Sequence, residues 1–136
     1  MSPFEILEHT ADVGVRAEAA ELTELFAEVT FGLLDISGAW APGPGERVDI
    51  SVQGGDLGAT LVDWLEGVLY LQDARDSVIT SVTVEAVSPE GATGWVEIAP
   101  RTADLEGTAV KAITYHQLEV RRTETGMWVA VVYFDI

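Results

Sequence analysis

The rarest side chains in this sequence are also well suited to chemistry. Lys111 is its only lysine, and His9 and His116 are its only histidines. None of the three lies in a segment with an amphipathic helical pattern. A histidine can exchange protons or bind a metal near neutral pH, but it can equally be a hydrogen-bonded structural residue in a turn. Residue type alone leaves both roles open for His9 and His116.

A second candidate is the carboxyl end of the sequence, where Asp135 and Ile136 follow an apolar run. If the last strand runs beside the first one, Asp12, in the loop that closes the N-terminal hairpin, approaches Asp135 and the α-carboxylate of Ile136. Carboxylates in contact raise one another's pKa unless a cation offsets their repulsion, and hard divalent cations prefer oxygen ligands. With no cysteine and few histidines, Ca²⁺, Mg²⁺ or Mn²⁺ is favoured over Zn²⁺. The alternative is an ordinary solvated terminus.

The composition of the sequence argues against several classes of function. The sequence has 23 acidic and 7 basic residues and a net charge of −16. Such a surface repels phosphate backbones, so tight direct binding of RNA or DNA is not expected, and a basic protein partner or a cation is favoured. The sequence contains no phosphate-binding loop and no Gly-x-Ser-x-Gly motif. No apolar run approaches the ~20 residues of a membrane span, and no signal peptide is recognisable, so we expect a cytoplasmic protein.

The elements that must position these residues follow from hydrophobic periodicity. The pattern predicts strands at 4–8, 13–19, 47–52, 78–87 and 95–98, with a turn at 91–94, and a C-terminal hairpin of 115–122 and 127–135. It predicts one helix that begins at Leu22, with Thr23 as its cap, and ends just before Gly38, and another from Leu57 to about Arg75 capped by Asp56. The last strand is apolar on both alternating sets, as is typical of a central strand.

Together these elements predict one domain, residues 1–136, of the α+β class. Two helices would pack on a mostly antiparallel sheet of about six or seven strands. Fold class alone says little about function.

Several sequence blocks spread over the whole chain form a recognisable set. The long ones are residues 4–15, with His-Thr-Ala-Asp at 9–12, residues 111–120, which begin Lys-Ala-Ile-Thr-Tyr-His, and residues 132–136. Shorter ones lie at 25–26, 31–33, 61–65 and 69–71. Taken in order, these blocks resemble the archease family, whereas residues 39–47 and 85–104 carry no signature of it.

The resemblance implies a non-enzymatic cofactor of the GTP-dependent RNA-splicing ligase that joins tRNA exon halves. Archeases promote guanylylation of the ligase's active-site histidine by GTP and allow multiple turnover. The resemblance also implies an SHS2-type fold, a strand-helix-strand-strand module with added strands. A ligase that binds RNA and GTP presents a basic surface, toward which an acidic cofactor is steered.

The same resemblance implies site residues. Family members hold a divalent cation, seen as calcium, at positions that correspond to Asp12, Asp135 and Ile136. His9, Thr10, Lys111 and His116 fall in family motifs and are expected to support the site, and no catalytic residue is expected.

Two other functions remain as alternatives. One is a chaperone-like modulator of a tRNA-modifying methyltransferase, a role also proposed for archease-like proteins. The other is a stand-alone metal-dependent hydrolase, which lacks support because the sequence offers no paired nucleophile and base.

Overall fold

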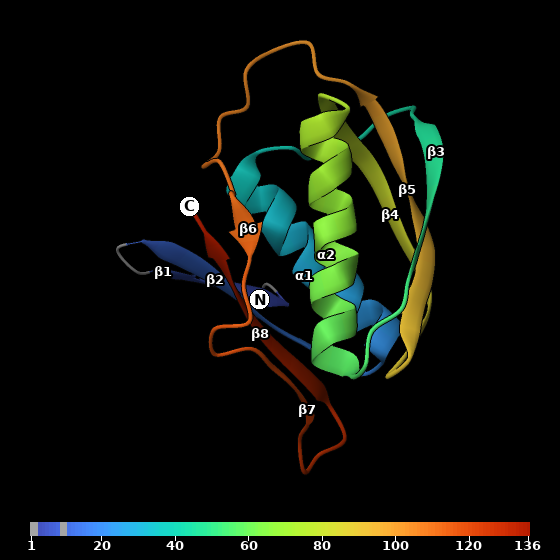
Figure 1. Cartoon of the computed structure of the whole chain (residues 1–136), viewed down its shortest axis with the longest axis vertical. Helices are drawn as coiled ribbons and strands as arrows, with labels where there is room; N and C mark the ends of the chain where they lie inside the picture. Colours follow the sequence, from blue (N-terminus) through green and yellow to red (C-terminus); the bar gives the residue numbers. More distant parts are fainter. Residues whose placement is uncertain (1–2, 9–10) are drawn as a thin grey trace.

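The computed structural model describes residues 3–8 and 11–136, and within these ranges the chain forms two helices and eight strands (Figure 1). In chain order the elements are β1 (Phe4–Glu8), β2 (Asp12–Ala19), α1 (Leu22–Ser37), β3 (Glu46–Val52), α2 (Leu57–Ala74), β4 (Ser77–Ser88), β5 (Gly91–Pro100), β6 (Ala112–Ile113), β7 (Glu119–Arg122) and β8 (Trp128–Asp135). The α+β class is confirmed.

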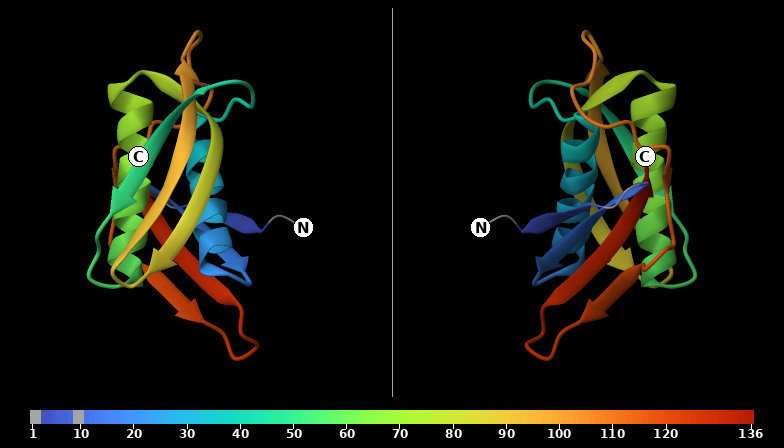
Figure 2. Two further views of the ribbon diagram at one scale, coloured as in Figure 1. Left: turned by 90° about the vertical axis from the view of Figure 1, so that its right-hand side faces the viewer. Right: turned by 90° about the vertical axis from the view of Figure 1, so that its left-hand side faces the viewer.

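The strands form two antiparallel sheets. The larger sheet has the order β1-β2-β8-β6, with β7 also paired to β8, and the smaller has the order β3-β5-β4. Both helices lie between the two sheets (Figure 1), and Figure 2 shows the molecule from the side of the smaller sheet and from the side of the larger one. The sequence predicted one sheet, because alternation reveals which face of a strand is buried and not which strand it pairs with.

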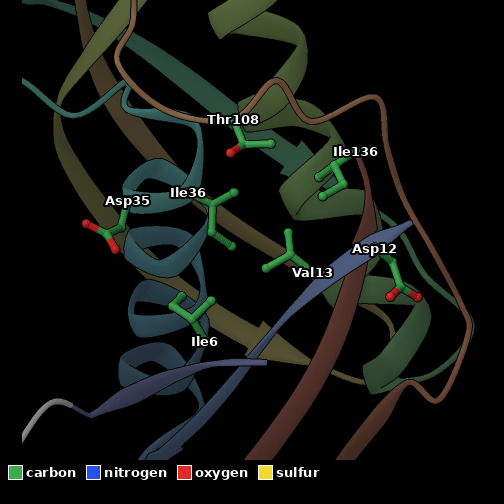
Figure 3. A pocket seen from close by; sticks show the side chains of 7 residues that line it. All are labelled: Ile6, Asp12, Val13, Asp35, Ile36, Thr108 and Ile136. Atoms are coloured by element: carbon green, nitrogen blue, oxygen red, sulfur yellow. The ribbon is translucent and has the colours of Figure 1, made fainter. Parts of the chain in front are cut away.

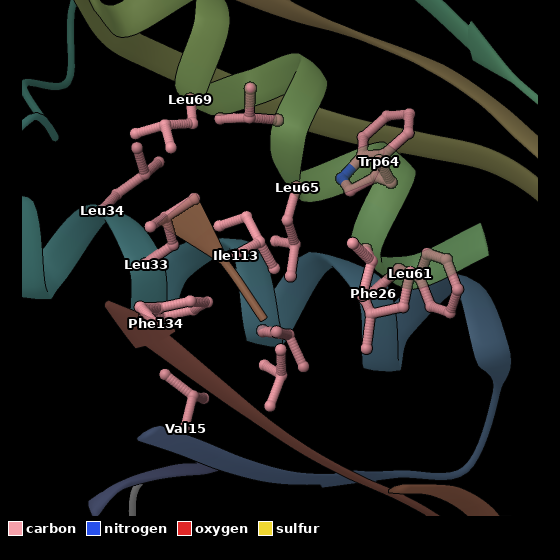
Figure 4. Close-up of a cluster of buried hydrophobic side chains, with 14 of the residues drawn as sticks. Val15, Phe26, Leu33, Leu34, Leu61, Trp64, Leu65, Leu69, Ile113 and Phe134 are labelled. Atoms are coloured by element: carbon pink, nitrogen blue, oxygen red, sulfur yellow. The ribbon is translucent and has the colours of Figure 1, made fainter. Parts of the chain in front are cut away.

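The core is built from the apolar stripes of both helices and the inner faces of both sheets. Figure 4 shows side chains of α1, α2, β2, β6 and β8 meeting in one cluster. Trp64 of α2 is fully buried there, and its indole N–H donates to Thr30 Oγ1 of α1 at 3.0 Å. This bond satisfies the polar atom of a large buried side chain and joins the two helices.

The helix ends agree with the sequence at three of four positions. Asp56 caps α2, since its Oδ1 accepts a hydrogen bond from the Ala59 N–H at 2.8 Å. The C-cap of α2 is Arg75, and Gly38 ends α1 in the left-handed conformation. Thr23 was wrong as the cap of α1, because the N-cap is Glu21, which makes no side-chain capping bond.

The turn predicted at 91–94 was also wrong. These residues lie inside β5, and the connection from β4 is made at Pro89 and Glu90. A Cβ on Gly94 would overlap the Thr83 carbonyl oxygen of β4 and lie 2.9 Å from Trp64 Cη2, so this glycine permits the close approach of both the paired strand and the indole.

The prediction of a central last strand is confirmed. β8 pairs with β2 on one side and with β6 and β7 on the other. Ala130, Val132 and Phe134 of its inner face are fully buried, and Val129 and Tyr133 of the opposite face are buried as well. No helix in the described ranges is both long and apolar enough to cross a membrane.

Candidate functional site

The last strand brings the two predicted acidic ligands together. Asp12, the first residue of β2, stands directly opposite Asp135, the last residue of β8. Directly opposed residues of an antiparallel pair project to the same face, with Cβ atoms ~5 Å apart. The two side chains therefore project side by side from one end of the larger sheet.

Backbone hydrogen bonds fix the chain around this pair. The Lys111 N–H donates to the carbonyl oxygen of Asp135 at 2.8 Å, just before β6 pairs with β8. The Ile136 N–H donates to the carbonyl oxygen of Ala11 at 3.5 Å. These bonds continue the pairing on both sides of the C-terminal end of β8, so residues 135–136 are not a detached terminus.

The side chain of Asp12 contains a buried polar atom whose hydrogen-bonding capacity is not satisfied. Its Oδ1 atom is buried and has no hydrogen-bond partner within residues 3–8 and 11–136. A buried acceptor left without a partner costs ~1–3 kcal/mol, and more when it is charged. A bound cation would remove that cost, because carboxylate oxygens are the preferred ligands of hard divalent ions.

A pocket of about 370 Å³ lies at this end of the larger sheet (Figure 3). Asp12 and Ile136 both line it, together with Ile6, Val13, Asp35, Ile36 and Thr108. Figure 3 shows the carboxylate of Asp35 directed away from the other labelled side chains. The carboxylate of Asp12 is likewise directed away from them, on the face of the sheet to which Asp135 also projects.

A divalent cation at this end of the sheet would need backbone or water ligands in addition to side-chain carboxylates. Among the described residues, no group of three or more acidic or histidine side chains is close enough to hold a metal ion. The two carboxylates plus the backbone oxygen of Ile136 would supply three oxygen ligands, and water commonly completes the shell of Ca²⁺ or Mg²⁺.

Two of the four residues expected to support the site, Lys111 and His116, lie in the described part of the chain. His9 and Thr10 lie outside the described residues. Lys111 is tied to the acidic pair through its backbone, whereas its side chain lines a separate groove between α2 and β6. His116 is exposed, and its ring meets the ring of Tyr133 edge-on with centroids 6.3 Å apart.

Tyr133 accounts for the presence of a glycine at position 14, within the N-terminal block of residues 4–15. It stands opposite Gly14, and a Cβ on Gly14 would lie 2.8 Å from Tyr133 Cε1. The ring therefore occupies the space that any side chain at position 14 would need. This contact lies on the same face as Asp12 and Asp135, two residues along each strand.

Sequence reasoning missed Asp35 and Thr108 as pocket residues. Thr108 belongs to the irregular segment between β5 and β6, and its N–H donates to the Ile36 carbonyl at 2.7 Å. That bond places the segment against the end of α1. No periodic pattern signals such a contact, because it is made by the backbone.

Comparisons with known proteins agree over the full length of the chain. Residues 4–136 match the model of the Archease protein family. The chain is 34% identical to protein archease of Methanopyrus kandleri over 142 residues, covering 98% of this chain and 99% of the relative. It is 32% identical to protein archease of Pyrococcus furiosus over 142 residues, covering 100% of both.

Solved structures share the fold. The solution structure of Methanobacterium thermoautotrophicum protein 1598 superposes with a TM-score of 0.79 at 23% identity, covering 100% of both chains. The crystal structure of a Thermotoga maritima archease, described as a possible chaperone, superposes with a TM-score of 0.67 at 22% identity, covering 97% of this chain and 96% of that one.

Proposed function

The chain belongs to the archease family, and from that membership we propose that it is a protein cofactor of a GTP-dependent RNA-splicing ligase. It promotes guanylylation of the ligase's active-site histidine by GTP and allows multiple turnover in tRNA exon joining. It has no catalytic residue of its own. The family match and the acidic residues at the end of β8 both support this role.

The observation that carries the proposal is the cross-strand pair Asp12 and Asp135, with the buried Asp12 Oδ1 unpartnered among the described residues. Asp12, Asp135 and the backbone oxygen of Ile136 would hold a divalent cation there. When bound, such a cation supplies positive charge that offsets the charge of phosphate groups. Asp12 and Asp135 hold it on a strand pair locked by backbone hydrogen bonds, so the site is presented rigidly at the end of the sheet.

Charge supports the choice of partner. A net charge of −16 disfavours direct binding of RNA or GTP phosphates by this chain alone. A ligase that handles RNA and GTP exposes basic groups, and long-range attraction speeds the encounter of an acidic cofactor with such a surface.

A second candidate is a chaperone-like modulator of a tRNA-modifying methyltransferase. It is favoured by the description of the Thermotoga maritima archease as a possible chaperone. Affinity capture with this protein as bait separates the candidates, provided that the captured enzyme is then purified and its activity measured with and without the protein.

The experiment that tests the first candidate is RNA ligation under single-turnover and multiple-turnover conditions. We expect the protein at substoichiometric concentration to convert a ligase that stops after about one turnover into one that continues. Ligation that is the same with and without the protein would exclude this function. Phosphoester hydrolysis by the isolated protein would instead point to an enzyme.

A further inference from the structure

The solvent-facing side of α2 carries a stripe of acidic and aromatic residues. Asp63, Glu66, Tyr70 and Asp73 follow one another at intervals of three, four and three residues, which places them on one side of the helix. α2 contains no lysine or arginine, and its N-cap, Asp56, adds one more carboxylate.

Two tyrosines project from this region. Tyr70 is 66% exposed and Tyr115 is 60% exposed, a large exposure for aromatic side chains. Tyr115 belongs to a turn that packs on the first turn of α2 through Leu118, and partial burial and the negative charges of Asp63, Glu66 and Asp56 raise the pKa of its phenol. The α2 face is therefore defined by Asp56, Asp63, Glu66, Tyr70, Asp73 and Tyr115.

The turn that carries Tyr115 is held on α2 by a packing contact. A Cβ on Gly58 would lie 2.9 Å from Leu118 Cδ2, so the Leu118 side chain packs directly onto the first turn of the helix. The Leu118 N–H also donates to the Tyr115 carbonyl at 3.2 Å. Tyr115 thus stands on a closed turn anchored to the helix.

An apolar groove adjoins Tyr70. Its volume is about 280 Å³, it lies between α2 and β6, and its apolar lining is Leu69, Ala74, Ala112 and Ile113. Glu66, Tyr70, Asp73 and Lys111 complete the lining. An apolar groove beside carboxylates matches a long cationic side chain, which buries its aliphatic stem and keeps its charged end near acids.

We propose that the α2 face is a docking surface for an arginine-bearing basic surface of the partner protein. This inference rests on the proposed function, which makes that partner the RNA ligase. A guanidinium stacks on a tyrosine ring and binds carboxylates through its planar fork, so arginine uses both components of this face. Phosphate groups of RNA are repelled by the same carboxylates.

A second copy of this chain is not expected to bind at the α2 face. Each copy has a net charge of −16, and an isologous contact would set one acidic stripe against its equal. Complementary charge therefore selects a basic protein.

Docking at the α2 face would position the acidic pair of the larger sheet. The groove and the pocket beside Asp12 share no lining residue, so they are separate sites. They are linked through β6, since Ala112 lines the groove and stands opposite Asp135 in the sheet. A partner held on α2 is thereby one strand away from Asp135.

The test compares affinities of purified variants for the purified cognate ligase, measured by calorimetry at 0.1 M and 1 M salt, where the Debye length is about 10 Å and about 3 Å. One variant combines Tyr70→Ala with Tyr115→Ala, and a second combines Asp63→Asn with Glu66→Gln. The matched control combines Glu85→Gln with Glu90→Gln, which removes the same charge from exposed positions on and beside β4. Circular dichroism melts check that each variant is folded.

We expect the tyrosine variant to bind about tenfold more weakly than the wild type at both salt concentrations. The acidic variant should bind about fivefold more weakly at 0.1 M salt and differ little from the wild type at 1 M, because screening removes the attraction that it lacks. The control should stay within about twofold of the wild type in low salt.

Two results would overturn the docking surface while leaving the proposed function intact. One is wild-type affinity in both α2 variants, and the other is an equal loss in the control, which would mean that net charge alone governs binding. Failure of the wild type to bind the ligase would overturn the proposed function and this occupant together. A dimer of the wild type that the tyrosine variant abolishes would assign the α2 face to self-association instead.

Discussion

Replacing Asp12 by asparagine tests the cation site without changing the shape of the side chain. Asp12→Asn removes one of two carboxylates whose Cα atoms are paired across β2 and β8. At a separation of ~5 Å, two unit charges repel by about 1 kcal/mol in water and about 3 kcal/mol at an effective dielectric constant of 20. Because Asp135 is exposed, the smaller figure applies.

The variant should therefore be at least as stable as the wild type in a chelator. For a chain of this length, ~1 kcal/mol corresponds to about 4 °C in Tm, so Asp12→Asn should melt up to about 4 °C higher. Removing a charge from the sheet end opens no cavity in the core, so the variant should keep its fold.

Adding a divalent cation should make the wild type more stable than Asp12→Asn. A ligand at 100 times its Kd stabilises the folded state by about 2.7 kcal/mol, which is about 10 °C in Tm for this chain. The wild type should gain that amount with Ca²⁺, Mg²⁺ or Mn²⁺, and Asp12→Asn should gain almost nothing. Asp135→Ala should behave in the same way.

The assay is scanning calorimetry with a chelator and then with each chloride salt, followed by calorimetric titration of the metal. Glu85→Gln is the control, since it removes an exposed charge far from β2 in the sequence and in another sheet. An equal metal-dependent rise in Tm in the wild type and in Asp12→Asn would refute the shared site.

Three further substitutions test the surrounding structure. Gly14→Ala should lower stability by about 1–3 kcal/mol in urea unfolding, because the new Cβ would lie 2.8 Å from Tyr133 Cε1, and an unchanged midpoint would contradict the packing described. Thr30→Val should cost about 1–3 kcal/mol by leaving the buried indole N–H of Trp64 without its acceptor, whereas Thr30→Ser should retain most of the bond. Burial and a like charge one turn earlier raise the pKa of Glu28, so this carboxyl destabilises the fold above that pKa and stops doing so as pH falls below the ordinary value of 4.5. Glu28→Gln should therefore raise Tm by ~1 °C at pH 7, with no difference below pH ~4, and a difference that persists in acid would contradict this cause.

Local chemistry made much of the fold predictable. Asp56 caps α2 as expected. Its short side chain stands just before the apolar helical stripe, where its carboxylate can accept a hydrogen bond from a free backbone N–H of the first turn. The unbroken apolar run of β8 identified a strand covered on both faces. The proximity of Asp12 to Asp135 followed from that central position, although β8 lies beside β2 and not beside β1.

The remaining features depend on contacts that leave no periodic signal. β6 is two residues long and exists because it pairs with the end of β8. Gly94 resembles a turn residue in the sequence, but its role is to let β5 approach both β4 and Trp64 closely. The separation of the strands into two sheets depends on the helices that lie between them, which only the assembled fold defines.

The α2 face was not predicted for a related reason. Tyr70 and Tyr115 are 45 residues apart in the sequence, and Tyr115 was assigned to a strand of the C-terminal hairpin and to the motif that contains Lys111 and His116. Their common surface depends on the packing of Leu118 against Gly58. Neither residue type nor spacing could indicate that contact.

The most direct test of the account is GTP-dependent labelling of the cognate ligase, followed as covalent nucleotide on the ligase over time. Substoichiometric wild-type protein should raise the rate and extent of labelling, Asp12→Asn should raise neither, and Glu85→Gln should match the wild type. The isolated protein should become neither labelled nor active in GTP hydrolysis, because it has no phosphate-binding loop. Labelling of the ligase that is unchanged by the wild-type protein, or stimulated equally by Asp12→Asn, would contradict the account.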